Sequence, residues 1–212
     1  MMKIALIGAS GFVGKAVLKE AATHGHEVTA IARNTDKIEA LPGVTAVAAD
    51  ASDTGALAKA IAGHDVVISA YNPGWGDPEI RQKQLSVSKD IIAAAKSAGI
   101  RLIMIGGAGS LEIQGKQLVD SPEFPAEWKE GALGARDALT AIRGEKDLEW
   151  TFLSPAIHLA PGERTEKYRL GTDSPVFDEK GESAISVEDM AVAIVSEVEN
   201  PKHIGKRFTL GY

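Results

Sequence analysis

The 212-residue chain contains no cysteine. A disulfide scaffold, a thiolate-ligated metal and a catalytic thiol are therefore excluded. No window reaches about 18 uninterrupted apolar residues, so no transmembrane helix is expected. Glycines interrupt the short apolar run near the N-terminus, which does not look like a signal peptide. We expect a soluble, cytoplasmic protein that does not bind membranes.

Clusters of basic residues are also absent. The sequence has 23 Lys and Arg against 29 Asp and Glu, a net charge of −6. Nucleic acids and anionic membranes attract clustered Lys and Arg, so we expect neither as a partner. The five histidines show no metal-ligand spacing in the sequence, and no metal is predicted. His24 and His26, on either side of a glycine turn, are expected at the surface.

What the chain does contain is an alternation of short apolar runs with amphipathic stretches of helical length. Strands buried on both faces appear as continuous apolar runs, and their alternation with helices implies right-handed crossovers in a parallel sheet. The sequence therefore predicts an α/β protein with a doubly wound parallel sheet, the Rossmann fold. The predicted strands are Lys3–Ile7, Glu27–Ala32, Val44–Ala49, Asp65–Ala70, Arg101–Ile105 and Trp150–Leu153, and the predicted helices are Gly14–Thr23, Thr54–Ala62, Pro78–Ala98 and Glu127–Arg143.

The last part of the chain, residues 154–212, is less regular. A helix is predicted at Ser186–Glu199, opened by a capping box between Ser186 and Asp189, and Arg207–Leu210 is predicted as an edge strand. We expect one NAD(P)-binding domain over residues 1–212, in which residues 154–212 form a small lobe on the substrate side.

A glycine-rich loop joins the first predicted strand to the first helix. Its glycines allow a tight turn and let phosphate oxygens approach the backbone, while the helix presents free amides and a positive dipole end. The position between a strand and a helix makes this pattern a specific signal for a dinucleotide. The alternative is a tight turn without a ligand. The predicted cofactor-binding loop is Gly8, Ala9, Ser10, Gly11, Phe12, Val13 and Gly14.

The end of the second predicted strand carries Arg33 where NAD-binding proteins place an acidic residue for the ribose hydroxyls. A carboxylate repels a 2′-phosphate, whereas a guanidinium binds it with two parallel hydrogen bonds. We therefore predict NADP as the cofactor, with NAD as the other possibility. The alternative is an exposed arginine without a ligand.

Several segments resemble a known family. KIALIGASGFVG, HGHEVTAIAR, AADASD, DVVISAYNP and IGGAGSL, followed by ISVEDMA and FTLGY, are similar to atypical short-chain dehydrogenases/reductases. Within that superfamily the chain resembles the NmrA-like NAD(P)H-binding branch. This branch includes the NADPH-dependent flavin reductase/biliverdin reductase B family and bacterial proteins described as NADH-flavin reductases or epimerases.

The resemblance implies further site residues. Asp50 and Ala51 are expected at the adenine, and Ala70 and Tyr71 beside the ribose and nicotinamide. Pro155, after the sixth strand, is expected at the cofactor as well. By its own position Asp50 could equally cap the following turn. The resemblance gives Ser110 a catalytic role, orienting the nicotinamide or the acceptor by a hydrogen bond; the alternative is a loop or cap serine.

One pair typical of the superfamily is missing. Its dehydrogenases and epimerases use Tyr-x-x-x-Lys, in which lysine lowers the tyrosine pKa for proton exchange. None of the three tyrosines has a lysine four positions later, and Trp128 and Lys129 stand where the tyrosine is expected. Hydride transfer to a flavin-like or quinone-like ring needs no such acid. We therefore predict a reductase of that kind, a monomer or weak homodimer. The alternatives are an NmrA-like dinucleotide sensor without turnover and an unusual epimerase or dehydratase.

Two segments are candidates for binding a flat acceptor such as FMN. The loop Tyr71–Gly76 carries Trp75, which is expected to stack on a planar ring or to cover the core. Residues 161–171 carry Tyr168 and two arginines, Arg164 and Arg169, which are expected near an anionic acceptor group or in a solvated loop.

Overall fold

The computed structural model describes residues 1–212 and contains one eight-stranded sheet in the order β10-β12-β8-β5-β4-β1-β2-β3. All neighbouring strands run parallel except β10, which pairs antiparallel with β12. The strand order reverses between β1 and β4, both of which pair with their neighbours along most of their length. The predicted fold class is confirmed: this is a doubly wound α/β domain.

The elements follow the predicted alternation closely. The strands of the main sheet are β1 (Lys3–Ile7), β2 (Glu27–Ala32), β3 (Val44–Ala48), β4 (Val66–Ser69), β5 (Arg101–Ile105), β8 (Trp150–Ser154), β10 (Arg169–Gly171) and β12 (Lys206–Gly211). The helices are α1 (Phe12–Thr23), α2 (Thr54–Ile61), α3 (Ile80–Ala98), α4 (Ala126–Arg143) and α5 (Val187–Glu199). Two further pairs are small: β6 (Glu112–Ile113) with β7 (Lys116–Gln117), and β9 (His158–Ala160) with β11 (Ala184–Ser186).

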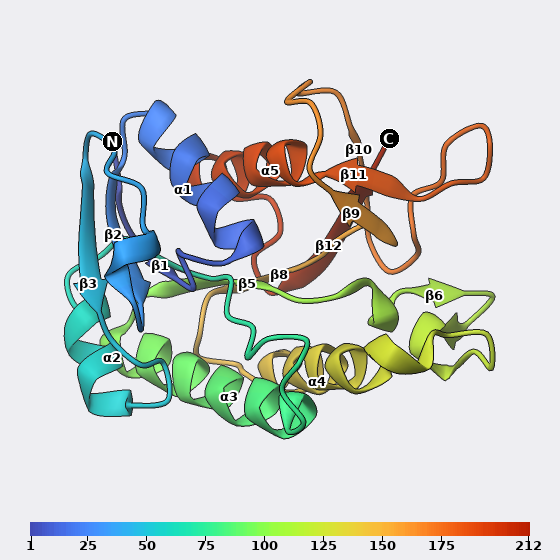
Figure 1. The fold of residues 1–212 in the computed structure, drawn as a ribbon, viewed down its shortest axis with the longest axis horizontal. Coiled ribbons are helices and arrows are strands. Elements are labelled where there is room, and N and C mark those ends of the chain that lie inside the picture. The colour runs from blue at the N-terminus through green and yellow to red at the C-terminus, as the bar shows by residue number, and fades with distance from the viewer.

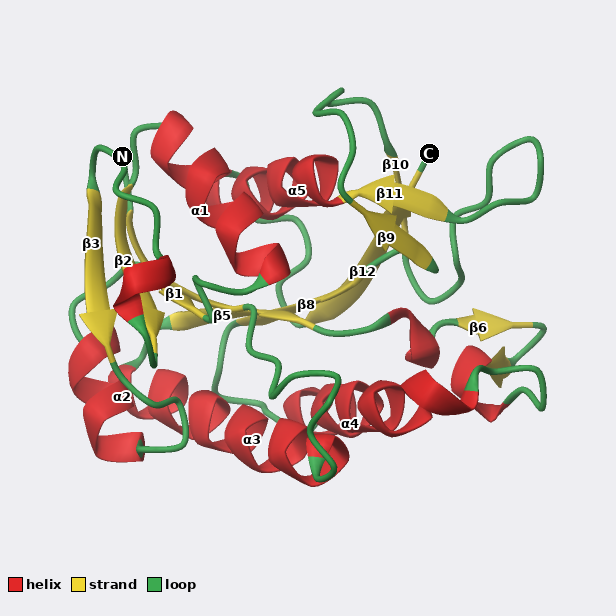
Figure 2. Ribbon diagram, in the orientation of Figure 1, coloured by secondary structure: helices red, strands yellow, loops and turns green.

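Helices cover both faces of the sheet (Figure 1). Figure 2 shows α1 and α5 in one layer and α2, α3 and α4 in the other, with the strands between them. Each layer closes its own apolar core, one of 24 and one of 21 buried residues. Because strand residues alternate between the two faces, β4 contributes Val66 and Ile68 to the first core and Val67 to the second.

The predicted C-terminal lobe is smaller than expected. Helix α5 packs on α1, and its residues share a core with β1 and β4. Strand β12 lies between β8 and β10, so the prediction of an edge strand at Arg207–Leu210 is wrong. The β9–β11 pair and the loops around β10 are what project beyond the main sheet, while β10 itself belongs to that sheet (Figure 1). The sequence could not reveal the extra pairing because β10 is only three residues long.

The starts of α1 and α5 differ from the predictions in ways that matter for the site and the core. Helix α1 begins at Phe12, so part of the glycine loop already forms its first turn. At α5 the Ser186 hydroxyl accepts a hydrogen bond from the Asp189 amide, but the reciprocal bond of a capping box is absent. The Asp189 carboxylate instead accepts hydrogen bonds from Thr165 and Tyr212. The buried carboxylate thus obtains its hydrogen-bond donors from segments that tertiary packing brings next to it.

None of the helices combines the length and apolar character that crossing a bilayer requires.

Candidate functional site

The glycine loop lies where the carboxyl end of β1 meets the start of α1. Gly8 has φ +80°, and a Cβ there would lie 2.6 Å from the Ala70 carbonyl oxygen at the end of β4. A Cβ on Gly14 would overlap the Gly8 carbonyl oxygen. The first position requires a left-handed backbone, and both exclude a side chain. These two glycines hold α1 close against the strand ends, as the spacing predicted.

The third glycine faces the space in front of the helix. A Cβ on Gly11 would meet only the Gly8 carbonyl oxygen, at 3.3 Å, and Gly11 is exposed. As the N-cap of α1 it offers no side-chain hydrogen bond, and the first turn has no acidic residue. The first amides of the helix are therefore free to bind an anion, assisted by the helix dipole. This cradle fits the pyrophosphate of a dinucleotide.

Arg33 follows β2 and is exposed. Its charge lies near Asp50, whose pKa is lowered by hydrogen bonds from the Ser52 amide and hydroxyl and further by Arg33. Asp50 thus caps the turn after β3 through one carboxylate oxygen, at 2.9 and 2.8 Å from the two Ser52 donors. Arg33 itself forms no salt bridge, so its guanidinium is available to a ligand at this edge of the sheet.

The other predicted cofactor residues line the same edge. Ala70 and Tyr71 follow β4 and are half-buried, and burial raises the pKa of the Tyr71 phenol. Ala51 is buried in the core beneath α2, and Pro155 is buried just after β8. Their backbones reach the carboxyl edge, where doubly wound folds bind ligands. Their direct contact with a cofactor stays a prediction.

Ser110 has a different environment from the one expected. It is 2% exposed and lies in a 3₁₀ turn after β5, η2 (Ala108–Ser110). The buried guanidinium of Arg207 donates to its hydroxyl at 3.1 Å and to its carbonyl oxygen at 2.9 Å, and Asp173 neutralises Arg207. Without exposed surface, Ser110 cannot touch a nicotinamide or an acceptor unless this loop moves. The geometry gives it a structural role and does not support the catalytic prediction.

The basic and aromatic side chains of the segment 161–171 are engaged by other parts of the chain. Arg164 lies over α1, where it donates to both carboxylate oxygens of Glu20 at 2.8 and 2.7 Å. Arg169 donates to the backbone carbonyls of Phe177 and Tyr212. Tyr168 packs against the core between α1 and α5. Tertiary contacts therefore already engage all three side chains, and the role of Tyr168 beside a planar acceptor, with Arg164 or Arg169 at its anionic group, stays a prediction that these contacts do not favour.

A cluster of histidines and glutamates lies on the same helical layer. His24, His26 and Glu199 place their ligand atoms within 4.8 Å of one another, and His26 is 4% exposed. The expectation of two surface histidines is thus wrong for His26. No local pattern indicates the grouping, because Glu199 is 173 residues away. The Met2 amide donates to His26 Nδ1, so His26 Nε2 carries the proton and donates to Glu199. A metal bound at Nε2 would oppose that tautomer, and we interpret the cluster as hydrogen-bonded.

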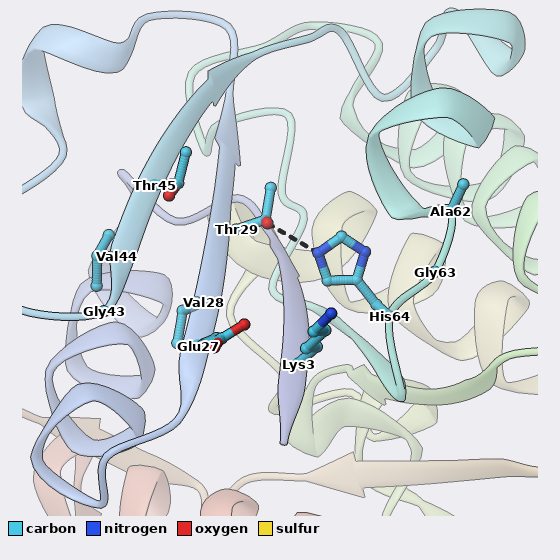
Figure 3. Close-up of a pocket in the computed structure, with 10 residues that line it drawn as sticks. All are labelled: Lys3, Glu27, Val28, Thr29, Gly43, Val44, Thr45, Ala62, Gly63 and His64. Carbon is cyan, nitrogen blue, oxygen red and sulfur yellow. Dashed lines mark hydrogen bonds between the residues drawn. The ribbon is translucent and has the colours of Figure 1, made fainter. Parts of the chain in front are cut away.

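A groove lies at the other end of the sheet. It has a volume of about 570 Å³ and lies beside the amino ends of β1, β2 and β3. His64 lines it, and its Nε2 lies 2.8 Å from the Thr29 hydroxyl (Figure 3). The His64 Nδ1 lies 2.9 Å from the Ile61 carbonyl oxygen, so both ring nitrogens are occupied. This groove is separate from the cradle, which lies at the carboxyl ends of the same strands.

The fold and the cradle define a Rossmann-type dinucleotide-binding protein. A family model described as NAD(P)H-binding matches residues 8–201. The chain belongs to this NAD(P)H-binding family, and its structural neighbours are consistent with the predicted resemblance to atypical short-chain dehydrogenases/reductases.

The similarity to known proteins extends over the whole chain. The uncharacterized protein YwnB of Bacillus subtilis is 38% identical over 99% of this chain and 98% of its own length. The structure of a "putative epimerase" from Bacteroides thetaiotaomicron is 44% identical, with a TM-score of 0.93 and coverage of 100% and 97%. That of a "putative NADH-flavin reductase" from Streptococcus pneumoniae is 35% identical, with a TM-score of 0.89 and coverage of 100% and 99%. The similarity to these relatives therefore includes both the glycine loop and the C-terminal segment.

Proposed function

We propose that this protein is an NAD(P)H-dependent reductase whose acceptor is a flavin-like or quinone-like ring. The observation that carries the proposal is a complete dinucleotide cradle at a sheet edge that lacks the Tyr-x-x-x-Lys pair. Trp128 and Lys129 lie on the exposed first turn of α4, where the superfamily places its tyrosine. An indole cannot exchange a proton with a substrate hydroxyl, which disfavours epimerisation by the usual route.

The cofactor would be held by groups that the chain already presents. The free amides of the first turn of α1 bind the pyrophosphate, and Arg33 binds a 2′-phosphate, which favours NADP over NAD. The backbone at Ala70 and Tyr71 supports the ribose and nicotinamide. When bound, the reduced dinucleotide would supply a hydride, and solvent would supply the one proton that completes the reduced flavin or hydroquinone. The task of the protein is then to align two rings and exclude water between them.

The test follows NADPH and NADH oxidation at 340 nm with FMN, riboflavin and menadione as acceptors. We expect oxidation above the buffer rate with at least one acceptor, and a preference for NADPH. The Gly11→Val variant is the matched control, since its branched side chain fills the cradle while the fold is kept. Tight NADP binding without oxidation of any acceptor would refute the reductase and identify a dinucleotide sensor.

A further inference from the structure

Exposed aromatic side chains gather at one end of the molecule. The three most exposed aromatic residues are Trp75 at 62%, Trp128 at 51% and Phe12 at 50%. They lie on the loop after β4, the first turn of α4 and the first turn of α1, all of which adjoin the carboxyl edge of the sheet. The remaining tryptophan, Trp150, is buried in β8. Singly exposed apolar residues are common, but a group beside a cofactor cradle indicates a binding surface.

The loop that carries Trp75 is held at both of its ends. The Asn72 side chain accepts a hydrogen bond from the Gly74 amide at 2.7 Å, and the Asp77 amide donates to the Gly74 carbonyl at 3.0 Å. The Asp77 carboxylate also lies 2.8 Å from Lys83 Nζ on α3. The exposed indole is therefore presented on a braced turn, which lowers the entropy lost when a ligand stacks on it.

Helix α4 contains a slot for this indole. A Cβ on Gly131 would lie 2.5 Å from Trp75 Cζ3 and 3.1 Å from Ile80 Cδ1, so the ring of Trp75 rests against the bare backbone of the helix. Trp128 stands three residues earlier, and residues at this spacing are neighbours on a helix surface. Glycine inside a helix is unfavourable, and here its absence of a side chain makes room for the indole.

We infer that Trp75 and Trp128 form the binding surface for the flat ring of the acceptor, and that Gly131 is a positioning residue that sets the place of Trp75. This inference rests on the proposed function and names its substrate class: neutral or anionic fused rings, bound by stacking. Aromatic stacking accepts any ring with an exposed π-face, because no directional hydrogen bond is needed. We expect riboflavin and FMN to bind alike, with little dependence on salt, since no arginine of the segment 161–171 is free to bind the phosphate.

The test measures binding of oxidised riboflavin in the presence of NADP, by quenching of riboflavin fluorescence, so that no turnover is required. Trp75→Leu and Trp128→Leu should each weaken riboflavin binding by about two- to tenfold, the range of a lost aromatic pair. Trp75→Phe should retain most of the affinity. Phe177→Leu, which removes an exposed aromatic ring on the distant lobe, is the matched control and should leave it unchanged.

Gly131→Ala tests the positioning role. The added methyl group displaces the indole of Trp75 while alanine favours the helix, so riboflavin binding should fall although the thermal midpoint is kept or raised. Circular dichroism melting of every variant separates lost binding from lost folding.

The outcomes distinguish this inference from the proposed function. Riboflavin bound at the tryptophans without NADPH oxidation supports the surface and overturns the reductase. NADPH oxidation with wild-type Michaelis constants for riboflavin in both leucine variants overturns the surface and leaves the reductase. Absence of riboflavin and menadione binding to the wild-type protein overturns the surface.

Discussion

Arg33 provides a direct test of cofactor choice. We expect Arg33→Ala to weaken NADPH binding and to leave NADH binding nearly unchanged, because the two cofactors differ only by the 2′-phosphate. Arg33 is exposed and forms no salt bridge, so its removal leaves no buried charge without a partner and should not affect stability. The carboxylates of Asp50 and Asp77 lie within range of the Arg33 charge, and they would repel the phosphate once that charge is gone.

The magnitude follows from the kind of contact. A charge-assisted hydrogen bond contributes about 1.5–3 kcal/mol, which corresponds to roughly 10- to 150-fold in Kd. Since solvent screens an exposed group, we expect the lower end, about tenfold for NADPH. Isothermal titration calorimetry with each cofactor at constant salt measures the effect. Lys19→Ala, an equal charge change on the exposed face of α1, is the control, and equal losses for NADPH and NADH in Arg33→Ala would refute the NADP assignment.

Three further predictions concern the cradle and the helical layer above it. Gly11→Val should abolish binding of both dinucleotides in calorimetry while the protein still unfolds cooperatively, because Gly11 has an ordinary helix N-cap backbone; retained binding would show that the loop is only a turn. Gly14→Ala should destabilise the fold by about 1–3 kcal/mol in urea unfolding, because its Cβ would overlap the Gly8 carbonyl oxygen, and wild-type stability would contradict the described approach of helix and loop. Hydrogen bonds from Arg164 hold the pKa of Glu20 below its ordinary value of 4.5. Glu20 therefore stabilises the fold above pH 4.5 and loses this contribution as the pH falls through the lowered pKa, so Glu20→Gln should show a shallower acid loss of stability than the wild type; parallel pH curves would show that the pair contributes nothing.

Local patterns were sufficient for the parallel strands and for all five helices. The apolar runs of β1, β2, β4 and β5 can be read directly, because a strand covered on both faces has no polar side to interrupt it. The glycine loop could be recognised in the same way, because two of its constraints are local. Gly8 has a left-handed backbone, and Gly14 lies close to the Gly8 carbonyl oxygen. Helix α5 was recognised for the same reason, through its amphipathic pattern and the cap at Ser186.

Contacts between distant segments could not be read in this way. The ion pair of Arg164 with Glu20 joins residues 144 positions apart, and the bond of Arg207 to Ser110 joins residues 97 apart. Arg164 and Ser110 looked available for chemistry because no residue nearby in the sequence occupies them. The exposure of Trp128 could not be predicted from the sequence either, since a tryptophan in a helix is more often a core residue.

The sequence by itself determined the class of fold and the place of the dinucleotide cradle, because both depend on short-range rules: the period of apolar residues and the backbone freedom of glycine. Only the tertiary structure decided which polar and aromatic side chains remain exposed at the carboxyl edge. It committed Ser110, Arg164 and Arg169 to buried bonds, ion pairs or backbone carbonyls, and it left Arg33, Trp75 and Trp128 exposed. The physical reason is that a charge or hydroxyl binds whichever partner packing brings within about 3 Å, and the separation of the two residues along the chain does not enter.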